Sequence, residues 1–203
     1  MMSRLATLGR INVPDWAFYT LAAGLAGALI VLAFLMRPYN AAAVVTEREL
    51  VVQGAALADL VNGPGTRVRF DPAHPDGPVA RATAAASYEI AGQMSAGVAA
   101  FTPDEFETRI AGRRIRVEFE VRASGPNGPD SVYIGYFTSG YGDSGWREQA
   151  VSQQYTTVSF EWDAPPYEGQ TFNESIGIWP DPDGQNREVL IRRIRVYLLS
   201  EPS

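Results

Sequence analysis

RIRVEFEVRA, residues 114–123, is the stretch that decides the fold class. Apolar side chains stand at every second position from Ile115 to Ala123, and charged side chains stand between them. Because successive side chains of a strand point to opposite faces of a sheet, this pattern buries one face and exposes the other. The stretch is therefore predicted to be a half-buried antiparallel strand whose outer face carries both charge signs.

A period of two recurs along most of the chain after residue 65. TVSFEWD at 157–163 repeats the alternation, whereas SVYIGYFTS at 131–139 is apolar on both faces and should lie centrally or line a groove. The shorter strand candidates are residues 67–70, 79–83, 86–91, 94–100 and 175–179. Clusters of Gly, Pro, Asn and Asp separate the candidates, so residues 66–203 are predicted to form an all-β sandwich or jelly roll.

The last strand, EVLIRRIRVYLL at 188–199, contains one extra residue at Arg192-Arg193. An extra residue in one strand of a pair is what a β-bulge produces. With a bulge at this point, five apolar side chains share the core face. They are Val189, Ile191, Ile194, Val196 and Leu198.

Three segments together resemble the carbohydrate-binding-module jelly rolls of the galactose-binding-like class. They are AGRRIRVEFEVRA at 111–123, YTTVSFEWDAP at 155–165 and EVLIRRIRVYLL at 188–199. The resemblance covers residues 66–199 and lies in strand pattern and order. It implies a two-sheet jelly roll, in which members often bind glycans on a concave aromatic face and sometimes hold a structural calcium. Arg192-Arg193 replaces the acidic pair that is usual in the terminal strand, so this chain departs from the pattern there.

WAFYTLAAGLAGALIVLAFLM, residues 16–36, contains no charged residue. At about 1.5 Å per residue, a helix of this length matches the hydrocarbon core of a bilayer, so a transmembrane helix is predicted. Arg4 and Arg10 precede it, which favours residues 1–15 in the cytoplasm and the rest of the chain outside. A cleaved signal peptide is the alternative, with an Ala-x-Ala site near residues 40–43, but the apolar run is longer than signal peptides use.

Small residues share one side of this helix, at spacings of three and four. They are Thr20, Ala23, Gly24, Gly27 and Ala28. Such a face lets another helix, a flat pigment or a lipid approach closely. The alternative is that an alanine-rich composition scatters small residues throughout the chain.

Residues 37–65 are expected to join the anchor to the β domain as a partly helical stalk. TEREL at 46–50 has the capping-box pattern, and a helix could run from there to Val61, before Asn62-Gly63-Pro64-Gly65. A strand at residues 50–53 stays open as the alternative.

Composition and motif content exclude most chemistry. The net charge is −6, which argues against a nucleic-acid partner because phosphates must be neutralised by cations. The chain has no cysteine and one histidine, His74, which lies in a Pro-rich loop between Asp71 and Asp76. No nucleophile motif, P-loop or dinucleotide fingerprint occurs. We therefore expect no catalytic residue, no cofactor and no metal.

WPDPDG at 179–184 poses the sharpest question about a ligand. Asp181 and Asp183 could suggest calcium, but Gly184 follows at once and the spacing of a calcium loop fails. Proline and glycine at these positions instead predict a tight turn before the last strand.

Several side chains outside the clear core positions are candidates for a recognition surface, because flat rings stack on sugars and also anchor protein interfaces. They are Tyr133, Phe137, Tyr141, Trp146, Arg147, Tyr155 and Trp179. Packing inside the sandwich is the alternative for most of them, and for Trp179 it is the favoured one. The glycine-rich loop TSGYGDSGWRE at 138–148 is the best recognition segment.

These expectations describe a non-catalytic, single-pass protein of a bacterial inner membrane, with its N-terminus in the cytoplasm and its β domain in the periplasm. Two functions stay open. In the first, the protein is an accessory subunit of a membrane complex, such as a respiratory or photosynthetic assembly, with the bilayer and other transmembrane subunits as partners. In the second, it is an anchored module that binds a cell-envelope glycan. The first is favoured, because the chain has no enzyme domain for a module to target and its helix has a close-packing face.

Overall fold

A computed structural model describes residues 14–35, 43–138, 142–166 and 174–199. The chain divides into two compact units, residues 1–39 and residues 40–203. The first unit contains the helix α1, Asp15–Leu35. Within the described ranges, no helix combines the length and the apolar character that a membrane crossing requires. The helical conformation of this segment agrees with the sequence, whereas its role as an anchor stays a prediction.

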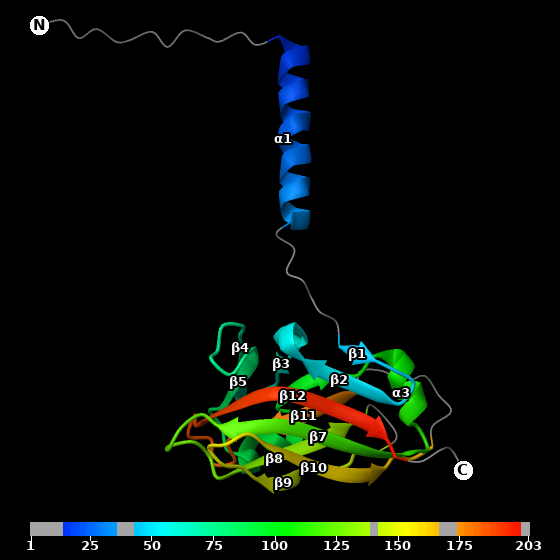
Figure 1. Ribbon diagram of the computed structural model, residues 1–203, viewed down its shortest axis with the longest axis vertical. Coiled ribbons are helices and arrows are strands. Elements are labelled where there is room, and N and C mark those ends of the chain that lie inside the picture. Colours follow the sequence, from blue (N-terminus) through cyan, green and yellow to red (C-terminus); the bar gives the residue numbers. More distant parts are fainter. Residues whose placement is uncertain (1–13, 36–42, 139–141, 167–173, 200–203) are drawn as a thin grey trace, which may run out of the picture. The chain divides into compact units, whose positions relative to one another are not determined.

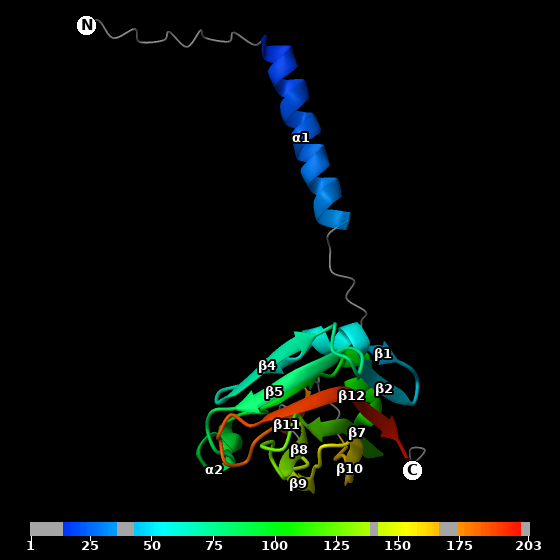
Figure 2. The ribbon, with the colours of Figure 1, turned by 60° about the vertical axis from the view of Figure 1, so that its left-hand side comes forward.

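The second unit is a β-sandwich of two antiparallel sheets, which Figures 1 and 2 show from two sides. The larger sheet, sheet A, has seven strands. They are β1 (Val44–Val45), β2 (Glu49–Gln53), β4 (Thr66–Asp71), β5 (Val79–Ala84), β7 (Arg114–Ala123), β10 (Thr156–Asp163) and β12 (Glu188–Leu198).

Sheet B has five strands in the order β3-β6-β11-β8-β9. They are β3 (Val61–Asn62), β6 (Val98–Phe101), β8 (Ser131–Phe137), β9 (Arg147–Ala150) and β11 (Ser175–Trp179). Among its described residues, the unit also contains four short helices. They are the 3-10 helices η1 (Gly54–Asp59) and η2 (Gly92–Met94) and the α-helices α2 (Tyr88–Ala91) and α3 (Asp104–Ile110).

The last strand, β12, organises sheet A. It pairs with β7 along one side, and with β5 and then β2 along the other. The register shifts between Ile191 and Arg193, so the predicted bulge is confirmed. The five apolar side chains expected on the core face are all buried. A bulge thus lets one long strand serve two partner strands on the same side while keeping its apolar face inward.

The core lies between the two sheets. Ile115, Val117, Phe119 and Val121 of β7 are all buried there, as their alternation predicts. α3, which the sequence pattern did not indicate, adds the buried side chains of Phe106 and Ile110. The predicted all-β sandwich is therefore confirmed.

The helix expected over residues 46–61 is found only in part, as the 3-10 helix η1. Thr46 Oγ1 does accept hydrogen bonds from the backbone N–H groups of Arg48 and Glu49, at 3.3 and 3.0 Å. The turn nevertheless leads into the strand β2 rather than into a helix, because β2 buries Leu50 and Val52 against the core and pairs with β12. Tertiary pairing overrides the local capping pattern. The strand alternative at 50–53 is the one realised.

Two strand candidates also differ. Residues 88–94 form α2 and η2 rather than a strand, and β6 is limited to Val98–Phe101. Gly97, directly before β6, has a backbone φ of 66°, a conformation that favours glycine. This helical segment passes over the outer face of sheet B.

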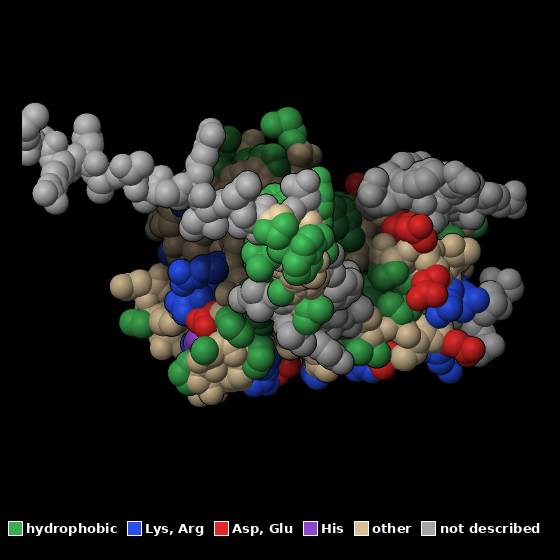
Figure 3. Space-filling model, turned by 90° about the horizontal axis from the view of Figure 1, so that it is seen from above, with side chains coloured by type: hydrophobic (Ala, Val, Ile, Leu, Met, Phe, Trp, Pro, Cys, Tyr) green, Lys and Arg blue, Asp and Glu red, His purple; other side chains and the backbone are tan. Residues whose placement is uncertain are grey.

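The outer face of sheet A carries a ladder of ion pairs. Arg114 and Arg116 pair with Glu161 of β10, and Arg195 of β12 pairs with Glu49 of β2. Glu120 pairs with the two arginines of the bulge. Figure 3 shows one face of the molecule, where arginines and acidic side chains lie in neighbouring groups rather than in separate fields. The predicted mixed-charge exterior is confirmed, and its charges largely satisfy one another.

Candidate functional site

The outer face of sheet B is covered by the chain itself. At two positions, Gly135 of β8 and Gly177 of β11, a side chain would have no room. A Cβ at Gly177 would collide with the carbonyl oxygen of Ala96, and one at Gly135 would lie 3.0 Å from that of Gly145. The Phe137 ring contacts the same two glycines. Glycine thus allows two loops to lie directly on the sheet.

An aromatic cluster lies beside these glycines. The rings of Tyr88 and Tyr133 are stacked, with centroids 4.2 Å apart and planes inclined by 20°. Trp146 meets Tyr88 edge-on at 6.1 Å and packs on Phe137 at 4.7 Å. The Trp146 indole also donates a 2.9 Å hydrogen bond to the carbonyl of Gly92. Trp179 lies beneath, fully buried, and donates to the carbonyl of Asp181.

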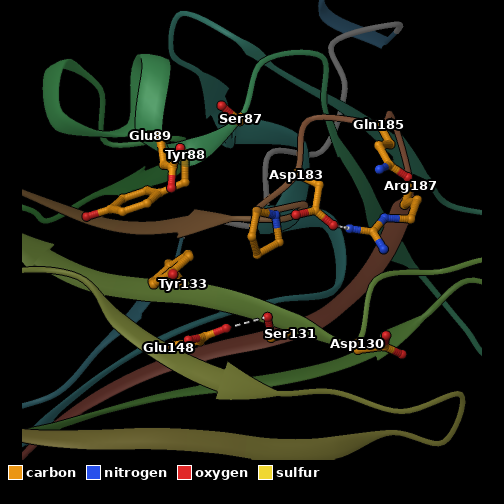
Figure 4. Close-up of a pocket in the computed structure, with 11 residues that line it drawn as sticks. Ser87, Tyr88, Glu89, Asp130, Ser131, Tyr133, Glu148, Asp183, Gln185 and Arg187 are labelled. Atoms are coloured by element: carbon orange, nitrogen blue, oxygen red, sulfur yellow. Dashed lines mark hydrogen bonds and ion pairs between the residues drawn. The ribbon is translucent and has the colours of Figure 1, made fainter.

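A groove of about 570 Å³ opens next to the stacked tyrosines, and Figure 4 shows the side chains that line it. Three segments supply them: the start of α2, the neighbouring strands β8 and β9 with the loop before them, and the turn between β11 and β12. The lining residues are Ser87, Tyr88, Glu89, Asp130, Ser131, Tyr133, Glu148, Pro182, Asp183, Gln185 and Arg187. A volume of this size falls in the range of small-molecule sites.

Backbone contacts hold the walls of the groove together. The N–H of Tyr88 donates a 2.9 Å hydrogen bond to the carbonyl of Pro182. Gly184 has a φ of 70°, and a Cβ there would collide with the backbone of Ala86 and Ser87. The turn is therefore packed against the start of α2 at a distance that only glycine permits.

Asp181 holds the turn from inside. Its side chain is fully buried and accepts hydrogen bonds from the backbone N–H groups of Gln185, at 2.7 Å, and Arg187, at 3.0 Å. The Arg187 guanidinium donates two more, at 3.0 and 2.6 Å. The predicted tight turn before the last strand is confirmed, and the burial of a carboxylate at its centre is compensated by this guanidinium.

The electrostatics of the groove follow from this pairing. Hydrogen bonding to Asp181 raises the pKa of the Arg187 guanidinium, which also pairs with Asp183. Burial raises the pKa of the Tyr133 hydroxyl, and the carboxylates of Glu148, Glu89 and Asp183 raise it further. Glu148 in turn accepts a 2.7 Å hydrogen bond from Ser131. The groove therefore presents phenol hydroxyls, other hydroxyls and carboxylates, with the Arg187 guanidinium held in its turn.

The predicted recognition residues separate into three groups. Tyr133 lines the groove, and Phe137, Trp146 and Trp179 form the packed cluster behind it. Arg147 is exposed on β9 and does not line the groove. Tyr141 lies outside the described residues.

Tyr155 lies apart from the others, against the sheet A ladder. The guanidinium of Arg192 lies 4.4 Å from its ring centroid, and that of Arg122 lies 5.2 Å away. Burial raises the pKa of the Tyr155 hydroxyl. Tyr155 is therefore a packing partner of arginines and not part of the groove.

The predicted helix-packing residues lie on the first unit. Thr20, Gly24 and Ala28 line a shallow apolar groove along α1, and Ala23 and Gly27 do not. Thr20 also donates a 2.7 Å hydrogen bond to the carbonyl of Trp16. Packing of another helix against this face stays a prediction.

His74 and its neighbouring carboxylates are occupied by other contacts. Asp71 pairs with Arg81, and Asp76 pairs with Arg122. His74 Nδ1 accepts a 3.2 Å hydrogen bond from the N–H of Asp76. Across the described ranges, no three His, Cys, Asp or Glu side chains gather in an arrangement that could hold a metal ion.

Most of the groove was not anticipated from the sequence. Tyr88 and Glu89 stood in a segment expected to be a strand, where their side chains would point to opposite faces. Asp183 and Arg187 lie in the predicted turn, where Asp183 was considered only as a calcium ligand and Arg187 was not singled out. The spacing of Asp181 and Arg187 on either side of Gly184 was the available signal, since a turn brings such side chains together.

No family model and no curated protein matches the sequence. Solved structures do share the fold. The CBM22-2 xylan-binding domain from Paenibacillus barcinonensis Xyn10C superposes with a TM-score of 0.52 at 5% identity, over 75% of this chain and 99% of that one. The CBM22-1 xylan-binding domain of the same protein gives 0.50 at 10% identity, over 70% and 86%.

A third similar structure is the C-terminal family 22 carbohydrate binding module of Clostridium thermocellum Xyn10B. It gives a TM-score of 0.50 at 6% identity, over 70% of this chain and 86% of that one. At these identities the likeness concerns the fold. The carbohydrate-binding-module-like jelly roll that the strand pattern suggests is therefore supported.

Proposed function

We propose that the β domain is a non-catalytic glycan-binding module and that the groove beside Tyr88 and Tyr133 is its binding site. This proposal replaces the favoured expectation of an accessory subunit with its alternative. The observation that carries it is the combination of a stacked aromatic pair with hydroxyl, amide and carboxylate groups in one groove. Sugar rings present apolar C–H faces and polar hydroxyl edges, and both kinds of partner are needed to hold them.

The position of the groove also follows from the covered sheet. Phe137, Trp146 and two loops fill the outer face of sheet B over Gly135 and Gly177, so this surface is occupied by the protein itself. The groove at its edge is the place where aromatic and polar side chains meet in open space. The site therefore suits a short stretch of glycan.

Titration of the full-length protein with soluble xylo- and cello-oligosaccharides tests the proposal. The shared fold with xylan-binding domains makes xylo-oligosaccharides the first probe. Tyr88→Ala should weaken binding by about tenfold or more, because it removes one ring of the stacked pair and its contact area. Isothermal calorimetry or quenching of tryptophan fluorescence measures the affinity.

Tyr197→Ala is the matched control. Tyr197 is a half-buried tyrosine on the ladder of sheet A, away from the groove, and its loss should leave the affinity unchanged. Circular dichroism of both variants checks folding. Absence of binding to any polysaccharide of the panel, or equal binding by wild type and Tyr88→Ala, would contradict the proposal.

We also propose that α1 holds this module at the outer surface of a bacterial inner membrane. The charge-free run of residues 16–36 and the arginines before it support this arrangement. Intact-mass measurement of the mature protein should find the chain still carrying residues 16–36. A mature chain beginning near Ala43 would indicate a cleaved signal peptide instead.

A further inference from the structure

The charge balance inside the groove points to the class of glycan, an inference that rests on the proposed function. The described residues that line the groove include one guanidinium, that of Arg187, and four carboxylates. They are Glu89, Asp130, Glu148 and Asp183. They come from α2, from the loop before β8, from β9 and from the turn before β12, so they surround the opening rather than lie along one strand (Figure 4).

The protein itself neutralises Arg187, the cation found among the described residues of the groove. Arg187 pairs with the buried Asp181 and with Asp183, and Asp181 needs this pairing because its charge has been removed from water. The guanidinium is therefore held by its own turn and is not available to a carboxylate on a ligand. Arg187 therefore offers no unpaired positive charge to the carboxylate of an acidic sugar.

The other carboxylates keep their charge unpaired. Among the described residues, Glu89, Asp130 and Glu148 take part in no ion pair, although Glu148 accepts a hydrogen bond from Ser131. Burial is the main cause of the raised pKa of the Tyr133 hydroxyl, and the further increase from Glu148 and Glu89 agrees with a negative potential within the groove. This negative potential lies beside Tyr88 and Tyr133, the two rings that would contact the sugar.

We propose that the groove selects glycans that carry a protonated amine, such as polymers of a free amino sugar, over neutral and acidic glycans. The tyrosine pair contacts the face of the sugar ring, while the surrounding carboxylates stabilise an ammonium group on its edge. Three unpaired exposed carboxylates should favour the amine by about fivefold to tenfold, since each exposed charge pair contributes a modest amount. Screening by salt should reduce this preference, because the carboxylates are exposed.

Two oligosaccharides with the same backbone test this selectivity. Chitosan oligomers carry free amines, and their N-acetylated counterparts of the same length are neutral. The full-length protein is titrated with both, at a pH where the amine is protonated and the carboxylates are ionised. We expect the amine form to bind about fivefold to tenfold more tightly at low ionic strength. The difference should shrink at high ionic strength, and an oligogalacturonate should bind more weakly than either.

Variants assign the selectivity to the groove. Glu89→Gln combined with Asp130→Asn should remove most of the preference for the amine, so that the amine and N-acetylated forms bind with similar affinity. Glu47→Gln removes one exposed carboxylate outside the groove and should change nothing. Equal or tighter binding of the N-acetylated form, or a preference that persists in the double variant, overturns the selectivity and leaves the glycan-binding proposal standing. Absence of binding to every glycan, the neutral panel included, overturns both.

Discussion

The outer faces of the two sheets are built in opposite ways. On sheet A the exposed side chains of β7, β10 and β12 alternate regularly with core residues and pair across the strands, as Arg116 does with Glu161. On sheet B the outward positions of β8 and β11 include the glycines 135 and 177, and loops lie on them. The outer face of sheet A is thus occupied by ion pairs, whereas the outer face of sheet B is covered by loops of the same chain.

This difference explains why the groove lies where it does. The paired charges on sheet A are poor binding partners for a ligand, because each new contact would have to replace an existing ion pair. A face covered by loops leaves space where the loops end, and the side chains there come from segments far apart in the sequence. The groove is such a space, bordered by the start of α2 and by the turn before β12 (Figure 4).

The largest expected effect, a loss of folding stability, comes from removing the buried carboxylate that holds the turn before β12. Asp181→Ala removes the fully buried carboxylate that accepts hydrogen bonds from three turn N–H groups and pairs with Arg187, and it leaves Arg187 with the exposed Asp183 alone. Loss of one partner of a buried ion pair costs about 3–5 kcal/mol of folding free energy. Urea unfolding of the full-length protein measures the change.

Asp183→Ala is the matched control for this variant. Asp183 pairs with the same arginine, but its side chain is 60% exposed, so its loss should cost less than about 1 kcal/mol. Comparable losses in the two variants would show that burial of Asp181 does not support the turn. A selective loss for Asp181→Ala would establish that this border of the groove depends on one buried charge.

The regular half of the fold could be predicted from sequence periodicity. Side chains of β7 alternate strictly, and the apolar positions of β12 change register at Arg192-Arg193, so the two faces of β7 and the bulge of β12 follow from the order of apolar residues alone. Local patterns were weaker guides at residues 46–61. There a helix-capping sequence precedes a strand, because pairing with β12 and burial of Leu50 outweigh the local preference.

The candidate site could be predicted only in part. Tyr133 could be predicted because it is an aromatic residue outside the clear core positions, in a strand that is apolar on both faces. Tyr88 was not, since its segment Ala86–Ala91 has an apolar character that suits either a strand or a short helix. Periodicity reports which side chains point outward, but it does not report which loop will cover them. That depends on close approaches such as the one at Gly184, which are properties of the folded chain.

The smallest expected effect concerns the ladder of sheet A and depends on pH. Hydrogen bonds from Arg116, and then from Arg114, lower the pKa of the Glu161 carboxyl below its ordinary value. A carboxyl whose pKa is lower in the folded state stabilises the fold above its ordinary pKa, and this contribution disappears as the pH falls through the folded value. The effect of Glu161 should therefore be complete at neutral pH and fade below about pH 4.

Glu161→Gln tests this dependence, with urea unfolding midpoints measured from neutral to acidic pH. The variant should be slightly less stable than the wild type at neutral pH, because an exposed pair on a strand is screened by water and salt. The two should converge in acid, where the wild-type carboxyl is protonated and no longer attracts Arg114 and Arg116. Glu47→Gln, which removes an exposed carboxylate outside the ladder, should follow the wild type throughout. If instead the difference between Glu161→Gln and wild type grew on acidification, the paired charges would not be what stabilises this face. The outer face of sheet A could then no longer be distinguished from that of sheet B by the role of its ion pairs.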